Sequence, residues 1–252
     1  MIDLHTHILP FADDGAADLK TALAMGRAGE KQGLTTIAAT PHFYYLPDWD
    51  LIKDKVESLQ REFHREGLGI TLVSGAELLL EPNLSKLPLE QIPTYGDQGK
   101  YCLIEFSFRQ ISVYLNQVIF DLQVKGITPI IAHPERYLAV IRDPNIVLEW
   151  IDLGCLIQIN TGSVLGYFGP KIKETARIML THQMAHFLGS DGHNLKGRSL
   201  NLRKGYEAAA KILGIEMAHK MVADNPAVVL SGEFLEIDEP LRYKQKKRFF
   251  FF

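Results

Sequence analysis

Residues 1–7 read M-I-D-L-H-T-H, and this alternation of apolar and polar residues is typical of a β-strand. Asp3, His5 and His7 are spaced two residues apart, so their side chains share one face of that strand. A stretch with helical period follows and stops at Gly33, a residue type that commonly ends helices. The chain therefore opens with a strand and a helix, and the strand carries three ionisable side chains on one side.

Short apolar, β-branched segments and longer segments of helical period alternate along most of the chain. This order predicts βα units around a parallel sheet. So many strands with crossover helices fit a closed or nearly closed barrel better than an open doubly wound sheet, which remains the alternative. The predicted strands are residues 1–5, 34–40, 69–76, 101–106, 127–132, 155–160 and 185–189. The predicted helices are residues 17–32, 50–66, 111–125, 145–153, 171–182 and 200–213.

The composition is ordinary for a globular protein, with 252 residues of which 46% are hydrophobic and 23% charged. A formal net charge of −3 provides no basic field, so we expect no nucleic-acid partner. Cys102 and Cys155 are too few for a disulfide framework. No apolar run approaches the roughly 18 residues of a membrane span, and Asp3 stands where a secretory signal carries basic residues. We expect a cytoplasmic protein with one domain over residues 1–235 and a tail over 236–252.

Polar residues fall at the ends of the predicted strands. In a parallel βα barrel the carboxyl ends of all strands open on one face, so these side chains are expected to meet there. Glu105 is the most informative of them, because it lies in an apolar strand and an unpaired buried carboxylate is costly. Asp14 is weaker, since Asp13-Asp14-Gly15 would also suit a turn or a helix start. The strand-end residues are His42 after the second strand, Glu77 at the end of the third, Glu105, His133, and Asp191 and His193 after the last.

This donor set points to metal-dependent hydrolysis. Imidazoles and carboxylates without a cysteine suit zinc, manganese or iron, and one ion cannot use so many ligands, which implies roughly two or three ions. Clustered ions activate a water molecule and clamp the oxygens of a phosphate ester. Arg136 and Arg198 lie near two of the ligand clusters, and a guanidinium matches phosphate oxygens. The candidate ligands are His5, His7, Asp14, His42, Glu77, Glu105, His133, Asp191 and His193.

The sequence motifs of other catalytic mechanisms are absent or incomplete. Neither cysteine begins the C-x5-R loop of thiol-based phosphatases, because Arg109 lies one residue too far from Cys102. The chain has no Walker loop and no G-x-S-x-G elbow. His182 and His186 have the spacing of a helical zinc pair, but Gln183 replaces the glutamate of a metalloprotease, so we interpret them as structural.

Several of these motifs together resemble one superfamily. D-x-H-x-H at residues 3–7, Pro41-His42, H-P-E-R-Y at 133–137 and S-D-G-H-N at 190–194 are similar to the motifs of the polymerase and histidinol phosphatase (PHP) superfamily. Residues 8–15 and 191–198 resemble most its bacterial protein-tyrosine phosphatases, which are encoded with capsule and exopolysaccharide genes. The resemblance runs from Met1 to about Leu230.

The resemblance implies a distorted (β/α)7 barrel of the PHP type, with the active site at the carboxyl-terminal rim of the strands. It also implies a manganese site of two or three ions, with iron or zinc as alternatives, and phosphate contacts from Arg136 and Arg198. The implied substrate is phosphotyrosine on the tail of a membrane-linked bacterial tyrosine kinase that regulates polysaccharide synthesis. The implied ligand groups are His5, His7, Glu77 and Asp191 for one ion, Glu77, Glu105 and His133 for a second, and Asp14, His42 and His193 for a third.

Alternative functions stay open at this point. Histidinol-phosphate phosphatase or another small phosphoesterase would use the same ligands, and a metal-stabilised binding module would be non-catalytic. The stretch K-Q-K-K-R-F-F-F-F from Lys244 to Phe252 is basic and then aromatic. Such a segment suits a peripheral contact with an anionic membrane, and the alternatives are a disordered tail or a packing contact in a homo-oligomer.

Overall fold

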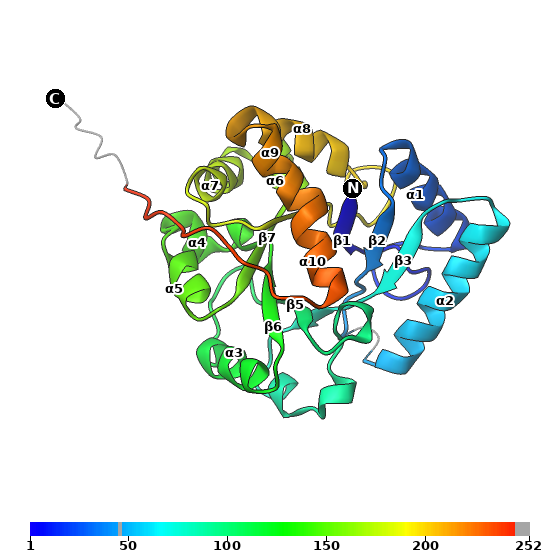
Figure 1. Ribbon diagram of the computed structural model, residues 1–252, viewed down its shortest axis with the longest axis horizontal. Helices are drawn as coiled ribbons and strands as arrows, with labels where there is room; N and C mark the ends of the chain where they lie inside the picture. Colours follow the sequence, from blue (N-terminus) through cyan, green and yellow to red (C-terminus); the bar gives the residue numbers. More distant parts are fainter. Residues whose placement is uncertain (45–46, 245–252) are drawn as a thin grey trace.

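The computed structural model describes residues 1–44 and 47–244 and shows an α/β fold whose paired strands run parallel (Figure 1). One sheet has the order β1-β2-β3 and the other the order β4-β5-β6-β7-β8. Parallel α/β folds bury their sheets under helices, and the strands here are correspondingly apolar. The strands are β1 (Ile2–Thr6), β2 (Thr36–Ala39), β3 (Thr71–Ser74), β4 (Glu77–Leu79), β5 (Tyr101–Glu105), β6 (Thr128–Ala132), β7 (Leu156–Asn160) and β8 (Phe187–Gly189).

Backbone hydrogen bonds connect the two sheets at both of their junctions. Beside β1 and β8, the His7 N–H donates to the carbonyl of Gly192 at 2.9 Å. Beyond β2, the Glu77 N–H donates to the carbonyl of Pro41 at 3.0 Å, and the Phe43 N–H donates back to the carbonyl of Glu77 at 2.9 Å. The carboxyl ends of strands from both sheets are therefore tied to one another around the same rim.

The predicted third strand, residues 69–76, is interrupted. Its first part is β3, which pairs with β2, and the chain then changes partner so that β4 pairs with β5. The change occurs at Gly75, where a Cβ atom would lie 3.0 Å from the Thr40 side chain. Glu77 consequently begins β4, and the prediction that it ends the third strand was wrong.

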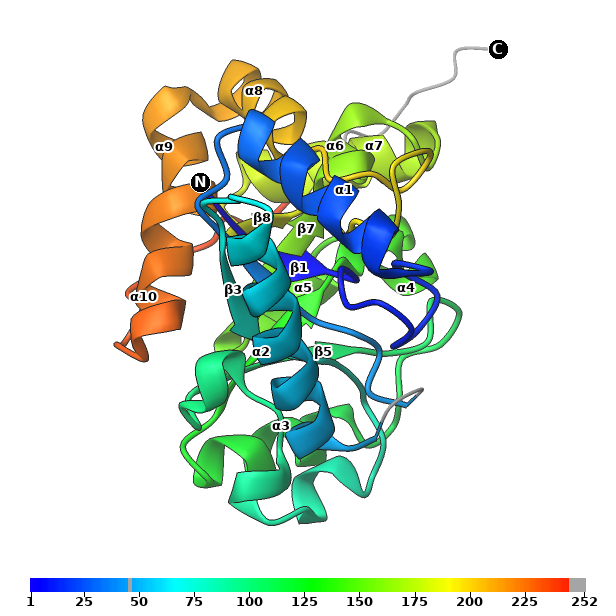
Figure 2. The same cartoon turned by 90° about the vertical axis from the view of Figure 1, so that its right-hand side faces the viewer.

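Six helices match predicted ones, with ends that differ by a few residues: α1 (Leu19–Lys31), α2 (Trp49–Arg65), α3 (Leu115–Val124), α5 (Ile146–Asp152), α7 (Pro170–Thr181) and α8 (Leu202–Leu213). The Asp18 and Asp48 side chains cap α1 and α2 by accepting backbone N–H groups. Figure 2 shows these two helices on the side that faces the viewer, where α2 packs on β3 and α1 lies beside α2. The helical elements not predicted are α4 (Leu138–Arg142), α6 (Thr161–Leu165), α9 (Ile215–His219) and α10 (Asn225–Ser231), the π turn Lys220–Asp224, and the 3₁₀ turns Leu84–Lys86, Leu89–Gln91, Tyr95–Asp97 and Pro134–Arg136.

A small apolar cluster supports the rim from one side of the sheet. It joins Leu103, Ile130 and Leu156 from adjacent strands with Phe187 of β8 and with residues of α10. Successive side chains of a strand alternate between faces, so Glu105 points to the same side as Leu103 two residues before it. Apolar packing at the start of each strand thus fixes the polar side chains at its end.

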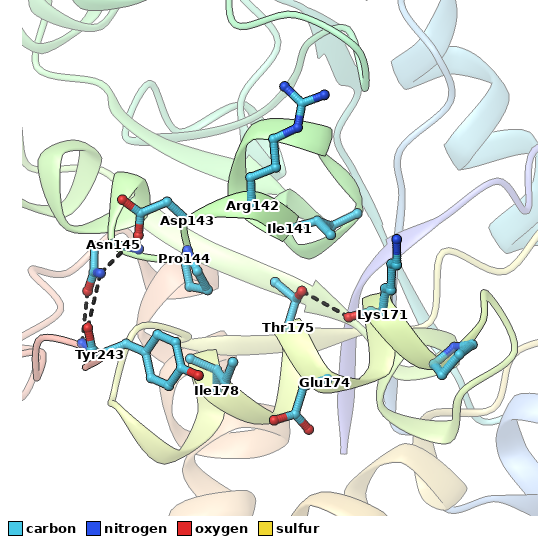
Figure 3. A pocket seen from close by; sticks show the side chains of 11 residues that line it. Ile141, Arg142, Asp143, Pro144, Asn145, Lys171, Glu174, Thr175, Ile178 and Tyr243 are labelled. Atoms are coloured by element: carbon cyan, nitrogen blue, oxygen red, sulfur yellow. Dashed lines mark hydrogen bonds between the residues drawn. The ribbon is translucent and has the colours of Figure 1, made fainter. Parts of the chain in front are cut away.

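The chain after α10 returns across the molecule toward α5 and α7 (Figure 1). The Leu241 N–H donates to the carbonyl of His182 at 2.8 Å. Tyr243 and Asn145 exchange two hydrogen bonds, of 2.8 and 3.1 Å, at the end of a cavity of about 1040 Å³ (Figure 3). Residues 245–252, which carry most of the predicted membrane contact, lie outside the described residues. None of the helices within 1–44 and 47–244 has the length and apolar character that a bilayer crossing requires.

Candidate metal centre

The nine predicted ligands meet in one cluster at the carboxyl ends of the strands. Each contacts at least one other member within 4 Å, and eight of the nine are buried, while the Asp14 side chain is 49% exposed. They come from β1 and the loop after it, from the loops after β2, β6 and β8, from the first residue of β4 and from the last residue of β5. Residues that are far apart in the sequence therefore form one site open to solvent on the Asp14 side.

Glu77 lies at the centre of this cluster. Its carboxylate is 2.8 Å from His133 Nε2, 3.0 Å from His42 Nδ1 and 3.3 Å from His5 Nε2, and it also lies 3.4 Å from the His7 ring. Burial alone would raise the pKa of Glu77, but the charge of His5 and hydrogen bonds from His133 and His42 hold it well below its usual range. Glu77 is thus an anion that faces four imidazoles.

Asp191 is the second anionic centre. One of its oxygens, Oδ1, lies 3.4 Å from His7 Nε2, 3.4 Å from His193 Nδ1 and 3.7 Å from His5 Nε2. Asp191 and His133 both have positive φ angles, 51° and 38°, in the region that side chains other than glycine rarely adopt. Backbone strain of this kind is commonly found at functional sites, and here it turns two candidate ligands into the cluster.

Two residues that the sequence analysis missed orient the histidines of β1. The Asp13 carboxylate accepts a hydrogen bond from His7 Nδ1 at 2.6 Å, and the amide oxygen of Gln158 lies 2.8 Å from His5 Nδ1. With a metal ion bound, each Nδ1 would keep its proton and each Nε2 would offer a lone pair. The two Nε2 atoms lie 3.2 Å apart and face Glu77 and Asp191. Without a metal ion a proton is held there: burial would lower the pKa of His7, but hydrogen bonds to Asp13, Asp191 and Glu77 raise it well above its usual value. A bound metal ion would take the place of that proton.

His193 fits the same interpretation. Its Nδ1 lies 2.9 Å from the carbonyl of Asp191, to which the N–H donates, so the lone pair is on Nε2. That buried nitrogen has no hydrogen-bond partner in the described part of the chain and lies 3.3 Å from Asp14 Oδ1. Burial, together with the charge of His7, lowers the pKa of His193 to about 3, so the ring is neutral. A neutral imidazole with an unused lone pair is the form that binds a metal ion.

The spacing of donor atoms also fits metal ions. Three groups have ligand atoms within 4.8 Å of one another, and they share His7, His42 and Glu77. The groups are His5–His7–Glu77, His7–Asp14–His42–His193 and His42–Glu77–Glu105. The first group is the ligand set implied around His5 without Asp191, and the second is the set implied around Asp14 with His7 added. The third group has His42 where the resemblance implies His133. The oxygen and nitrogen donors suit manganese, iron or zinc.

Both predicted arginines reach the cluster through Asp191. Arg136 Nη1 donates to Asp191 Oδ2 at 3.0 Å, and Arg198 Nη2 donates to Asp191 Oδ1 at 2.9 Å. Arg198 also lies 3.4 Å from Asp14 Oδ2. Two guanidinium groups and a set of metal ligands at one rim form an environment that can hold a phosphoryl group.

Asp3, the first residue of the D-x-H-x-H motif, lies beneath the ligands. Its Oδ1 accepts hydrogen bonds from the backbone N–H groups of Ser190, at 3.0 Å, and His5, at 3.3 Å. Burial raises its pKa to about 6. Asp3 thus ties β1 to the loop that carries Asp191 and His193.

Comparison with known proteins places this chain in a family. The family model described as "Capsular polysaccharide synthesis, CpsB/CapC" matches residues 1–231, and the chain belongs to this family. It is 32% identical to the tyrosine-protein phosphatase YwqE of Bacillus subtilis (strain 168), with 100% of both chains covered. It is 33% identical to the tyrosine-protein phosphatase CpsB of Streptococcus pneumoniae, covering 93% of this chain and 100% of that protein.

A solved structure has the same fold. It is described as belonging to YwqE from Bacillus subtilis and CpsB from Streptococcus pneumoniae, "unique metal-dependent tyrosine phosphatases". The TM-score is 0.92 at 31% sequence identity, covering 97% of this chain and 100% of that one. The family predicted from the motifs is therefore confirmed.

Proposed function

We propose that this chain is a metal-dependent protein-tyrosine phosphatase that acts on a bacterial tyrosine kinase of capsule or exopolysaccharide synthesis. The observation that supports this proposal most directly is the buried cluster around Glu77 and Asp191, where imidazole nitrogens and carboxylates converge beside two arginines. The names of the relatives support phosphotyrosine rather than histidinol phosphate as the substrate. The substrate segment is the phosphorylated tail of the kinase, which reaches the rim from solvent.

The rim belongs to a distorted (β/α)7 barrel. In this proposal β3 and β4 are two parts of one interrupted strand, and the hydrogen bonds beside β1 and β8 and beyond β2 close the circle. The phosphatase domain covers residues 1–235. This arrangement supports the site because every ligand-bearing segment then ends on the same face.

The site holds manganese, roughly two or three ions, with iron or zinc as alternatives. The nine predicted residues would hold the ions, and Glu77 belongs to two of the implied ligand groups. When bound, the ions supply an activated water molecule and neutralise charge on the phosphoryl group. Asp13 and Gln158 hold the His7 and His5 rings so that both Nε2 atoms face the ions.

Arg136 and Arg198 bind the phosphoryl oxygens. Asp191 lies between the two guanidinium groups and fixes one nitrogen of each. Arg198 Nη1 also donates to Asp14 Oδ2 at 3.4 Å, and the remaining N–H groups would contact the substrate. Charge on the phosphoryl oxygens is thereby met by donors that are already in place, which lowers the reorganisation needed for reaction. The rest of the substrate stays outside, because the Asp14 side of the cluster is open.

The protein acts in the cytoplasm in this proposal, next to the kinase at the membrane. The basic and aromatic stretch from Lys244 to Phe252 would supply a peripheral membrane contact. Sedimentation with anionic lipid vesicles, before and after deletion of residues 243–252, tests this contact. Equal sedimentation of the two proteins would remove the membrane role.

The function is tested by phosphate release from three substrates with added manganese and with chelator. We expect release mainly from a phosphotyrosine peptide, and loss of that release in chelator. Histidinol phosphate and a short single-stranded DNA are the comparison substrates. Release mainly from histidinol phosphate, or none from any substrate by metal-loaded protein, would overturn the proposal.

A further inference from the structure

Arg136 is held in an aromatic slot, although its neighbours were not singled out by any motif. Its Cζ lies 4.6 Å from the centre of the Phe108 ring and 4.6 Å from the centre of the Phe168 ring. Phe108 lies in the loop after β5, Phe168 lies in the loop between α6 and α7, and Asp191 follows β8. Three separate segments therefore converge on one guanidinium.

The surroundings of both rings indicate that their positions are set by the fold. Phe108 packs 5.5 Å from the His133 ring, and its carbonyl accepts the Leu138 N–H at 2.8 Å. Phe168 lies over Gly162, where an added Cβ would come within 3.0 Å of the ring. Gly162 thus leaves the room that the Phe168 ring occupies. Phe108 is 39% exposed, so its ring lies at the surface beside the cluster.

Arg198 provides an internal comparison. Its side chain is 35% exposed and the Arg136 side chain is 18% exposed, although both donate to Asp191. Among the described residues the aromatic faces lie over Arg136 and not over Arg198. A guanidinium is flat and binds aromatic faces through its charge, so a two-ring slot limits its rotation. Arg136 is accordingly the more restricted of the two arginines.

We propose that Phe108 and Phe168 are positioning residues that hold the Arg136 guanidinium against the phosphoryl group of the substrate. Asp191 fixes one nitrogen of Arg136 and the two rings fix its plane, so the remaining N–H groups keep one direction before the substrate arrives. The rings act through Arg136 and need not touch the substrate. This inference rests on the proposed phosphatase function and adds two residues to its machinery.

A double-mutant cycle on kcat/KM for a phosphotyrosine peptide tests the proposal in metal-loaded protein. Phe108→Leu and Phe168→Leu each lower kcat/KM about tenfold, and in an Arg136→Ala background the same changes alter it less than about twofold. Phe168→Tyr keeps a ring and retains most activity. Phe120→Leu, a change at an exposed phenylalanine of α3, leaves kcat/KM unchanged in both backgrounds.

Two results of the cycle would overturn the proposal. Unchanged kcat/KM in both single leucine variants would show that the rings do not matter for the reaction. A full loss that persists in the Arg136→Ala background would show that the rings act on the substrate or on the fold instead. Wild-type protein that releases no phosphate at all contradicts the proposed function, whereas active wild-type protein with active leucine variants contradicts this inference alone.

Recovery by free guanidinium gives a second readout that a merely structural role would not produce. Guanidinium chloride should enter the vacated slot of Arg136→Ala and raise kcat/KM to a plateau, compared with sodium chloride at equal concentration. Adding Phe168→Leu should remove most of this recovery. Equal recovery with and without the ring, or none in Arg136→Ala itself, would contradict a preformed slot.

Discussion

The Asp13 carboxylate and the His7 ring share a 2.6 Å hydrogen bond at Nδ1, which turns Nε2 of His7 toward the candidate metal site. The same carboxylate accepts the backbone N–H of His42 at 2.9 Å, so it links two candidate ligands from different loops. Hydrogen bonding to His7 lowers the pKa of Asp13 to about 2 despite its burial, and it stays charged at neutral pH. Asp13 is thus an orienting residue rather than only part of a turn.

We expect Asp13→Ala to weaken manganese binding by about 10- to 100-fold, because His7 would lose the partner that holds its tautomer and orientation. Calorimetric titration of the metal-free protein with manganese measures the change in affinity. Asp50→Ala is the matched control, since Asp50 is an exposed aspartate in the first turn of α2. Equal affinities of Asp13→Ala and wild type would remove Asp13 from the site.

Glu77→Gln should lower kcat on a phosphotyrosine peptide by about a thousandfold or more and reduce the bound metal. The substitution keeps the shape of the side chain but removes the negative charge that faces four imidazoles. Metal analysis and turnover are measured on the same purified sample. Glu81→Gln, at an exposed position two residues beyond β4, serves as the control. Full metal content with normal turnover would be incompatible with a central role for Glu77.

Arg198→Lys should lower kcat/KM about 10- to 100-fold while leaving the fold intact, because a lysine keeps the charge but cannot present the planar fork of donors. Steady-state kinetics on the phosphotyrosine peptide measures the loss. Arg203→Lys is the control at an arginine whose contacts are to Gln32 rather than to the cluster. Unaltered kcat/KM in Arg198→Lys would mean that the charge alone matters or that Arg198 does not bind phosphate.

His186 makes stability depend on pH away from the metal site. Its Nδ1 accepts the Ile157 N–H at 2.9 Å, and burial lowers its pKa from 6.5 to about 4. As the pH falls, the unfolded chain therefore takes up this proton at a higher pH than the folded chain does. Folding stability is lost as a result between about pH 6.5 and pH 4. These contacts match the structural role predicted for His186.

His186→Asn should remove this pH dependence while keeping an acceptor for the Ile157 N–H. Between pH 7 and pH 5, wild type should lose about 2 kcal/mol more unfolding free energy than the variant. Urea denaturation of the metal-free proteins at both pH values gives the difference. Parallel losses in the two proteins would show that His186 is protonated equally in the folded and unfolded states.

The local pattern of the sequence was enough to predict most of the strands and to single out nine polar residues that lie close together in the structure. Most candidate ligands stand in, at the end of, or just after an apolar segment, and parallel strands bring such positions together. Asp14 is the exception, because it lies within the loop between β1 and α1. The break at Gly75 could not be predicted, because it depends on a change of pairing partner from β2 to β5. The helices α4 and α6, of five residues each, are too short to show a helical period.

The orienting residues were missed for different reasons. Asp13 stands in a sequence that also forms turns, so its bond to His7 is visible only in three dimensions. Gln158 is 153 residues from His5, yet as a polar residue in the apolar strand β7 it carried the same signal that singled out Glu105. The aromatic slot of Arg136 has no local signal, because Phe108 and Phe168 come from loops that only the fold brings together.

The central claim, that this cluster is a multinuclear metal site that hydrolyses phosphotyrosine, is tested most directly by titrating metal-free protein with manganese. Bound metal and phosphate release from the phosphotyrosine peptide are recorded on the same samples. The account predicts no release without metal and a rise that reaches its plateau at roughly two to three ions per chain. Release that is undiminished in metal-free protein, or a plateau of bound metal without release, would contradict it.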